Sequence, residues 1–118
     1  MGYESRLYIV EVWDVPTMGK PYGEVIASIN MCKMPSDFSK LFINPIEYNC
    51  YLNSDEEYTK TDRYGDPIKD TDISTVINWL NNYIIKGKHY RRILPLYGLL
   101  SGFDETEWDN LRIVHFGY

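Results

Sequence analysis

The sequence predicts an apolar β-strand near each end of this chain. Residues 6 to 13 have the sequence RLYIVEVW, which is rich in β-branched and aromatic side chains and almost continuously apolar. A strand of this composition suits a sheet that is covered on both faces. Residues 110 to 118, with the sequence NLRIVHFGY, form the last predicted strand. Since helices precede that strand, we expect the two terminal strands to be neighbours in one sheet.

Further strands are predicted in the first half of the chain. Residues 24 to 34 alternate between apolar and polar side chains, which is typical of a strand with one solvated face. The stretch before it, residues 14 to 23, contains two prolines and two glycines and is predicted to be a loop. A third strand is predicted at residues 47 to 52, and residues 57 to 60 are compatible with one more short strand.

The clearest helix is predicted over residues 72 to 87. Its apolar residues recur at helical spacing and form one stripe: Ile73, Val76, Ile77, Leu80 and Ile84. Asp70, Thr71 or Asp72 can cap its start. This stripe needs an apolar surface to pack against, which the predicted sheet would supply.

Two further helical segments are predicted near the C-terminus. One lies within residues 90 to 101, and it must begin near Pro95 or bend there, because proline lacks an N–H and clashes with the preceding turn. The other is a short helical turn that follows Asp104, with Glu107 three residues later. Together these elements predict one α+β domain over residues 1 to 118. We expect a sheet of four or five mostly antiparallel strands with two helices packed on one face.

Charge and composition narrow the classes of function. The net charge of the 118 residues is −5, which argues against a general grip on nucleic-acid phosphates and makes nucleic acid an unlikely partner. The acidic stretch from SDEEY to DRYGD, residues 54 to 66, could instead imitate a phosphate backbone and occupy a nucleic-acid groove on another protein. The sequence shows no secretory signal and no apolar run that could span a bilayer, so we expect a cytoplasmic protein without membrane contact.

No motif in the sequence calls for a metal or a cofactor. Cys32 and Cys50 do not follow a zinc-binding spacing, and the only histidines are His89 and His115. His115 is predicted on the same strand face as Leu111 and Ile113, which favours a part-buried, hydrogen-bonded side chain over a catalytic one. The tyrosine count, eleven, is high, and tyrosine suits both the edge of a core and a contact surface.

Residues 61 to 67, TDRYGDP, concentrate turn-forming and charged residues. Glycine followed shortly by proline predicts a tight turn. Loops of this kind also bind partners, for which Asp62, Arg63, Tyr64 and Asp66 would provide the contacts. A third interpretation is a small metal-dependent hydrolase or nuclease in which Asp62 and Asp66 share a divalent ion.

The one basic cluster is KGKHYRR, residues 86 to 92. It is interpreted as a solvated connector between helices, or as a second partner contact through Tyr90, Arg91 and Arg92. The arginine forks and the tyrosine ring could also bind nucleic acid, which is the third functional alternative.

Three stretches resemble small proteins encoded by bacteriophages and prophages of Gram-positive bacteria. They are GYESRLYIVEV at residues 2 to 12, DRYGDPIKD at residues 62 to 70 and WDNLRIVHFGY at residues 108 to 118. Val12 departs from the pattern, which has lysine there. The resemblance implies a phage accessory protein in the bacterial cytoplasm that binds a host or phage protein and inhibits or redirects a host factor, such as a defence nuclease. It implies no cofactor and leaves the oligomeric state open.

Overall fold

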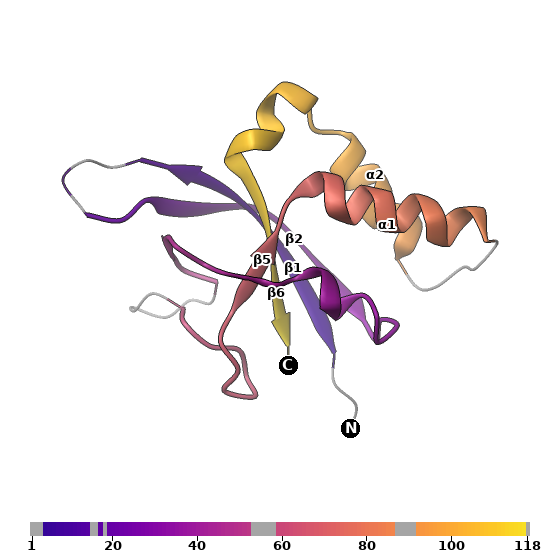
Figure 1. The fold of residues 1–118 in the computed structure, drawn as a ribbon, viewed down its shortest axis with the longest axis horizontal. Coiled ribbons are helices and arrows are strands. Elements are labelled where there is room, and N and C mark those ends of the chain that lie inside the picture. The colour runs from indigo at the N-terminus through magenta and orange to yellow at the C-terminus, as the bar shows by residue number, and fades with distance from the viewer. Residues whose placement is uncertain (1–3, 15–16, 18, 53–58, 87–91, 118) are drawn as a thin grey trace.

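The centre of the molecule is β1, Ser5–Trp13, which has a strand hydrogen-bonded along each of its edges. The computed structural model describes residues 4–14, 17, 19–52, 59–86 and 92–117. Along one edge β1 pairs with β2, Tyr22–Cys32, and along the other with β6, Leu111–Gly117, both antiparallel. The prediction that the two terminal strands are neighbours is therefore confirmed, and Figure 1 shows β1 and β6 side by side at the centre.

The sheet has six strands among the described residues, in the order β3-β5-β6-β1-β2-β4. The outer strands are short: β3 is Asn44–Pro45, β5 is Lys69–Thr71 and β4 is Asn49–Cys50. Only the contact between β2 and β4 is parallel. Six strands rather than the four or five expected is a correction, and the added strands are β3 and β5. Two or three residues with the sequences NP and KDT are too short and too polar to leave a strand pattern.

Several strands differ in extent from the predicted ranges. β2 begins two residues earlier than predicted, at Tyr22, and the third predicted strand is reduced to the two residues of β4. Of the short strand predicted at residues 57 to 60, residues 57 and 58 lie outside the described residues, while Thr59 and Lys60 are not in a strand.

Two α-helices cover one face of the sheet, as Figure 1 shows. α1 is Ile73–Ile85 and α2 is Ile93–Ser101. Asp72 caps α1, because its carboxylate accepts a hydrogen bond from the Thr75 N–H at 2.8 Å. Pro95 is the third residue of α2, where a missing N–H leaves no helical hydrogen bond unmade. Two 3₁₀ turns complete the fold, η1 at Ser39–Leu41 and η2 at Glu105–Asn110, and the second follows Asp104 as predicted.

Apolar residues fill both sides of the central strands. On the helix side, Leu7 and Ile9 of β1 pack in one cluster with Val76 of α1 and Leu96 of α2. On the other side, Tyr8 and Val10 pack with a layer that includes these side chains: Tyr48, Cys50, Leu52, Ile68, Val114 and Phe116. Because the chain from residue 46 to residue 52 lies over this second face, the sheet is covered on both sides where β1 crosses it. This explains the almost continuous apolar sequence of β1.

None of the helices in the described residues is long and apolar enough to cross a membrane.

Candidate functional site

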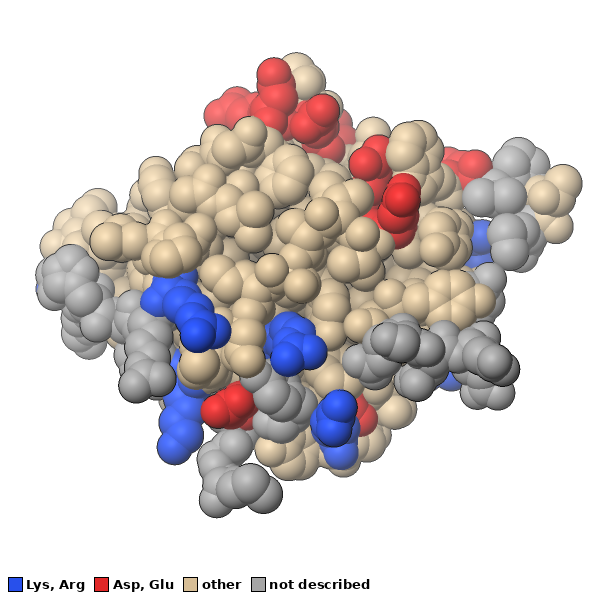
Figure 2. Space-filling model, turned by 180° about the vertical axis from the view of Figure 1, so that it is seen from behind, with Lys and Arg blue, Asp and Glu red and all other residues tan. Residues whose placement is uncertain are grey.

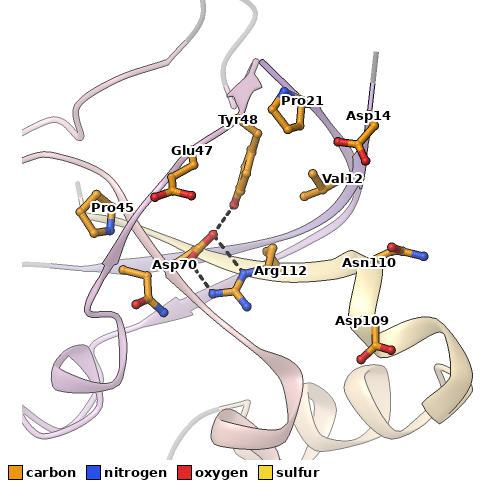
Figure 3. Close-up of a pocket in the computed structure, with 11 residues that line it drawn as sticks. Val12, Asp14, Pro21, Pro45, Glu47, Tyr48, Asp70, Asp109, Asn110 and Arg112 are labelled. Atoms are coloured by element: carbon orange, nitrogen blue, oxygen red, sulfur yellow. Dashed lines mark hydrogen bonds and ion pairs between the residues drawn. The ribbon is translucent and has the colours of Figure 1, made fainter. Parts of the chain in front are cut away.

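A cavity of about 440 Å³ opens on the face of the sheet opposite the helices. Its lining comes from four parts of the chain: the β1–β2 hairpin, the segment from β3 to β4, β5, and the junction of η2 with β6. Figure 3 shows these side chains around one hollow. The residues that line it are Val12, Asp14, Pro21, Asn44, Pro45, Glu47, Tyr48, Asp70, Asp109, Asn110 and Arg112.

Three polar side chains form a hydrogen-bonded network at the floor of the cavity. Asp70 of β5 lies between Tyr48 and Arg112, as Figure 3 shows. The Tyr48 hydroxyl donates to Asp70 Oδ2 at 2.7 Å. Arg112 donates twice, from Nη2 to Oδ1 at 2.7 Å and from Nε to Oδ2 at 3.2 Å. Asp70 is only 3% exposed, so the bidentate pairing with Arg112 compensates a charge that would be costly to bury alone.

The protonation of the network follows from its surroundings. Burial raises the pKa of the Tyr48 hydroxyl above its usual value, and the neighbouring Asp70 carboxylate raises it further. The hydrogen bond to Asp70 raises the pKa of the Arg112 guanidinium, although partial burial opposes this. Tyr48 is therefore a neutral donor and Arg112 a cation at neutral pH, and Arg112 forms an ion pair with Asp70 at the floor of the cavity.

The rim of the cavity, unlike its floor, carries exposed acidic side chains. Asp14, Glu47 and Asp109 are exposed carboxylates from three separate segments. Among the described residues, none of the three makes a hydrogen bond or an ion pair. Figure 2 shows that acidic side chains gather at the end of the molecule that carries η2, whereas most of the visible Lys and Arg lie in the lower half of the view, with some acidic side chains among them. At the floor of the cavity the charge of Asp70 is compensated by Arg112, whereas the three rim carboxylates have no such partner among the described residues.

Residues 61 to 67 form the tight turn that the sequence predicts. Asp62 Oδ1 accepts hydrogen bonds from the backbone N–H groups of Tyr64, at 2.8 Å, and of Asp66, at 3.1 Å. Gly65 adopts a φ of 81°, a conformation that favours glycine. The Arg63 N–H donates to the carbonyl of Gly117 at 3.1 Å, which ties the turn to the end of β6. All four predicted contact residues of this segment are thus brought together, and Tyr64 is 53% exposed.

A second, smaller cavity of about 260 Å³ lies beneath this turn and is lined by His115, Asp62 and Asp66 among others. His115 is buried, and its Nε2 lies 2.8 Å from the Ser5 hydroxyl. The prediction of a hydrogen-bonded histidine is confirmed, and the side chain is more deeply buried than the part-buried position expected. Burial lowers the pKa of His115 to about 4, although Asp62 opposes this. Ser5 is 3% exposed and is not part of the cavity lining, so the Ser5–His115 pair does not present a hydroxyl to a substrate.

The structure bears only in part on the other predicted contacts. Tyr90 and Arg91 lie outside the described residues. Arg92 is the N-cap residue of α2 in a left-handed conformation, with a φ of 61°, and its Nη1 donates to the carbonyl of Asn30 at the end of β2. Its guanidinium therefore already joins α2 to the sheet. Within the described residues, no group of three or more His, Cys, Asp or Glu side chains could hold a metal ion.

The sequence patterns do not predict the network of Tyr48, Asp70 and Arg112, and they indicate Asp70 only as a possible helix cap. Tyr48 and Arg112 lie 22 and 42 residues from Asp70 in the chain. No local spacing links three such residues. The only available signal was an arginine within an otherwise apolar strand, which indicates a buried acidic partner without identifying it.

No protein-family model, curated protein or solved structure matches this chain.

Proposed function

We propose that this protein is a non-enzymatic binding protein that contacts a partner protein through the turn at residues 61 to 67. The observation that carries the proposal is the use of the Asp62 carboxylate. One of its oxygens accepts two backbone hydrogen bonds within the turn, in addition to the backbone pairs Asp62–Asp66 and Gly65–Asp62, so the Asp62 side chain helps to fix the conformation of the loop. Arg63 and Tyr64 then extend from an ordered backbone, and both are exposed.

Side chains presented in this way are favourable for binding. Tyrosine and arginine are enriched among the residues that contribute most to protein interfaces. An ordered loop also loses little conformational entropy on association, which increases affinity for a given set of contacts. The anchoring of Arg63 N–H to Gly117 fixes the turn relative to the sheet.

The setting of this activity is proposed from the resemblance to phage proteins. The protein would act in the bacterial cytoplasm as an accessory protein that inhibits or redirects a host factor, for which a defence nuclease is one candidate. Contacts from Tyr90, Arg91 and Arg92 would be secondary, since the Arg92 side chain already binds Asn30.

The two alternatives have less support. A metal-dependent hydrolase or nuclease would require Asp62 and Asp66 to bind an ion, yet Asp62 Oδ1 is occupied by two backbone N–H groups of its own turn. A nucleic-acid-binding protein would depend on residues 86 to 92, of which the structure describes only Lys86 and Arg92.

A pull-down from host lysate tests the proposal. We expect the wild-type protein to recover a stoichiometric partner, and the double variant Arg63→Ala/Tyr64→Ala to recover at least tenfold less. The matched control is Trp13→Ala/Lys20→Ala, which removes an exposed aromatic and an exposed base at the β1–β2 hairpin. Recovery of no partner by the wild type, or equal loss in both double variants, would contradict a binding role for the turn.

A further inference from the structure

We propose that the cavity shown in Figure 3 is a second binding site, which takes an alkyl cation: a guanidinium or ammonium group on a short apolar stem. The cavity lies on the face of the sheet opposite the helices, whereas the turn at residues 61 to 67 meets the end of β6 at Gly117. This inference is independent of the binding role proposed for the turn.

The size and walls of the cavity suit such a ligand. A volume of about 440 Å³ falls within the range of roughly 300 to 1,000 Å³ that is usual for small-ligand sites. The side chains of Val12, Pro21 and Pro45 provide apolar surface that a chain of methylene groups can cover. Two amide side chains, Asn44 and Asn110, add hydrogen-bonding groups beside these walls.

The charges of the lining select a cation over an anion. Among the described residues, the lining contains four carboxylates and one guanidinium. Asp70 and Arg112 compensate each other at the floor, so the remaining carboxylates of Asp14, Glu47 and Asp109 determine the sign of the field at the mouth. An anion would meet like charge on three sides, whereas a cation would gain attraction that is weakened but not abolished by solvent.

The floor also gives the cavity a fixed shape. Tyr48 and Asp70 are 7% and 3% exposed, and three hydrogen bonds join them to each other and to Arg112. The three rim carboxylates come from different elements, so it is the fold rather than a local acidic run that brings them around one hollow. A site that exists before the ligand arrives needs little reorganisation on binding.

The test is a titration with n-butylguanidinium and n-butylammonium, followed by the chemical shifts of backbone amides at low ionic strength. We expect saturable shifts at Val12, Tyr48 and Asn110, with dissociation constants in the millimolar range that increase as salt is added. n-Butanol has the same stem without the charge, and we expect it to bind at least fivefold more weakly. Equal binding of n-butanol, or shifts centred elsewhere, would overturn the proposal.

Charge-neutral variants locate the site. Glu47→Gln and Asp109→Asn should each weaken n-butylguanidinium binding threefold or more without altering the buried network. Glu105→Gln is the control, because Glu105 is an exposed acid on η2 that does not line the cavity. If all three variants weaken binding equally, the effect is general surface charge and the site is refuted.

A blocked arginine, N-acetyl-arginine-methylamide, distinguishes the source of the cation. Tighter binding of the blocked arginine than of n-butylguanidinium supports a side chain of a partner protein as the natural occupant. Tighter binding of the free cation supports a small amine or guanidine. Binding of neither compound contradicts the proposal in both forms.

Discussion

Gly23 in β2 shows how a single residue controls the candidate cavity. A Cβ atom at this position would lie 2.6 Å from Val10 Cγ1 and 2.7 Å from Tyr48 Cδ2, which is closer than such atoms approach in proteins. Because Gly23 has no side chain, the Tyr48 ring can occupy the space beside it. The ring in turn places the hydroxyl that donates to Asp70.

Gly23→Ala should consequently destabilise the protein. We expect a loss of about 1 to 3 kcal/mol in the free energy of unfolding, which is typical of overpacking in a closely packed region. Urea denaturation gives the value. Gly98→Ala in α2 is the matched control: nothing lies within 4 Å of its added Cβ, and replacing a helical glycine by alanine should stabilise by about 0.5 to 1 kcal/mol. Equal stability of Gly23→Ala and the wild type would show that Tyr48 is not held in this way.

His115 makes stability depend on pH. Its pKa in the folded protein is about 4, below the ordinary value of 6.5, because burial disfavours the charged ring. Between these two values the unfolded chain binds the proton and the folded protein does not, so stability falls as the pH is lowered from about 6.5 toward 4. At 1.36 kcal/mol per unit of pKa, the full effect is on the order of 3 kcal/mol.

Urea denaturation at pH 7 and pH 5 measures this effect. The expected result is a lower free energy of unfolding at pH 5 for the wild type and a clearly smaller difference for His115→Gln, which cannot titrate. A pH dependence that is unchanged in His115→Gln would assign it to other groups. Asp72 and Asp104, whose carboxyl pKa values are lowered, contribute only at more acidic pH.

At the scale of elements, the sequence predicts α1 but not β5, the strand that directly precedes it. Local sequence is enough to predict this helix, because it has an apolar stripe over thirteen residues and a capping aspartate directly before it. β5, with the sequence KDT, has neither length nor pattern, and Asp70 and Thr71 are buried only because β6 and the segment around Tyr48 surround them. Its existence depends on tertiary contacts that a local pattern does not contain.

The cap of α1 can be tested directly. Asp72→Ala should lower the free energy of unfolding by about 1 kcal/mol, because the Thr75 N–H loses its acceptor. Asp72→Asn keeps an acceptor oxygen and should retain most of the stability. Burial by itself would raise the pKa of the Asp72 carboxyl, but the hydrogen bonds from Thr75 and the charge of Arg112 outweigh it. If Asp72→Asn is as unstable as Asp72→Ala, the charge near Arg112 matters more than the cap.

At the scale of the whole molecule, the sequence predicts the class of fold but not the candidate cavity. The adjacency of β1 and β6 was expected because the apolar sequence at each end of the chain predicts a strand. The turn at residues 61 to 67 is also predicted, because Asp62, Gly65 and Pro67 are local turn-forming residues. The cavity, in contrast, needs Val12, Tyr48, Asp70 and Arg112 at one place, and only the topology of the sheet supplies that arrangement.

The pairing of Ser5 with Gly117 has a consequence for biosynthesis. During translation β1 is made before β6, so one of its two edges has no partner until residues 111 to 117 have left the ribosome. The nascent chain therefore carries an apolar strand with an open edge while residues 14 to 110 are made, and the sheet can close only after residues 111 to 117 emerge.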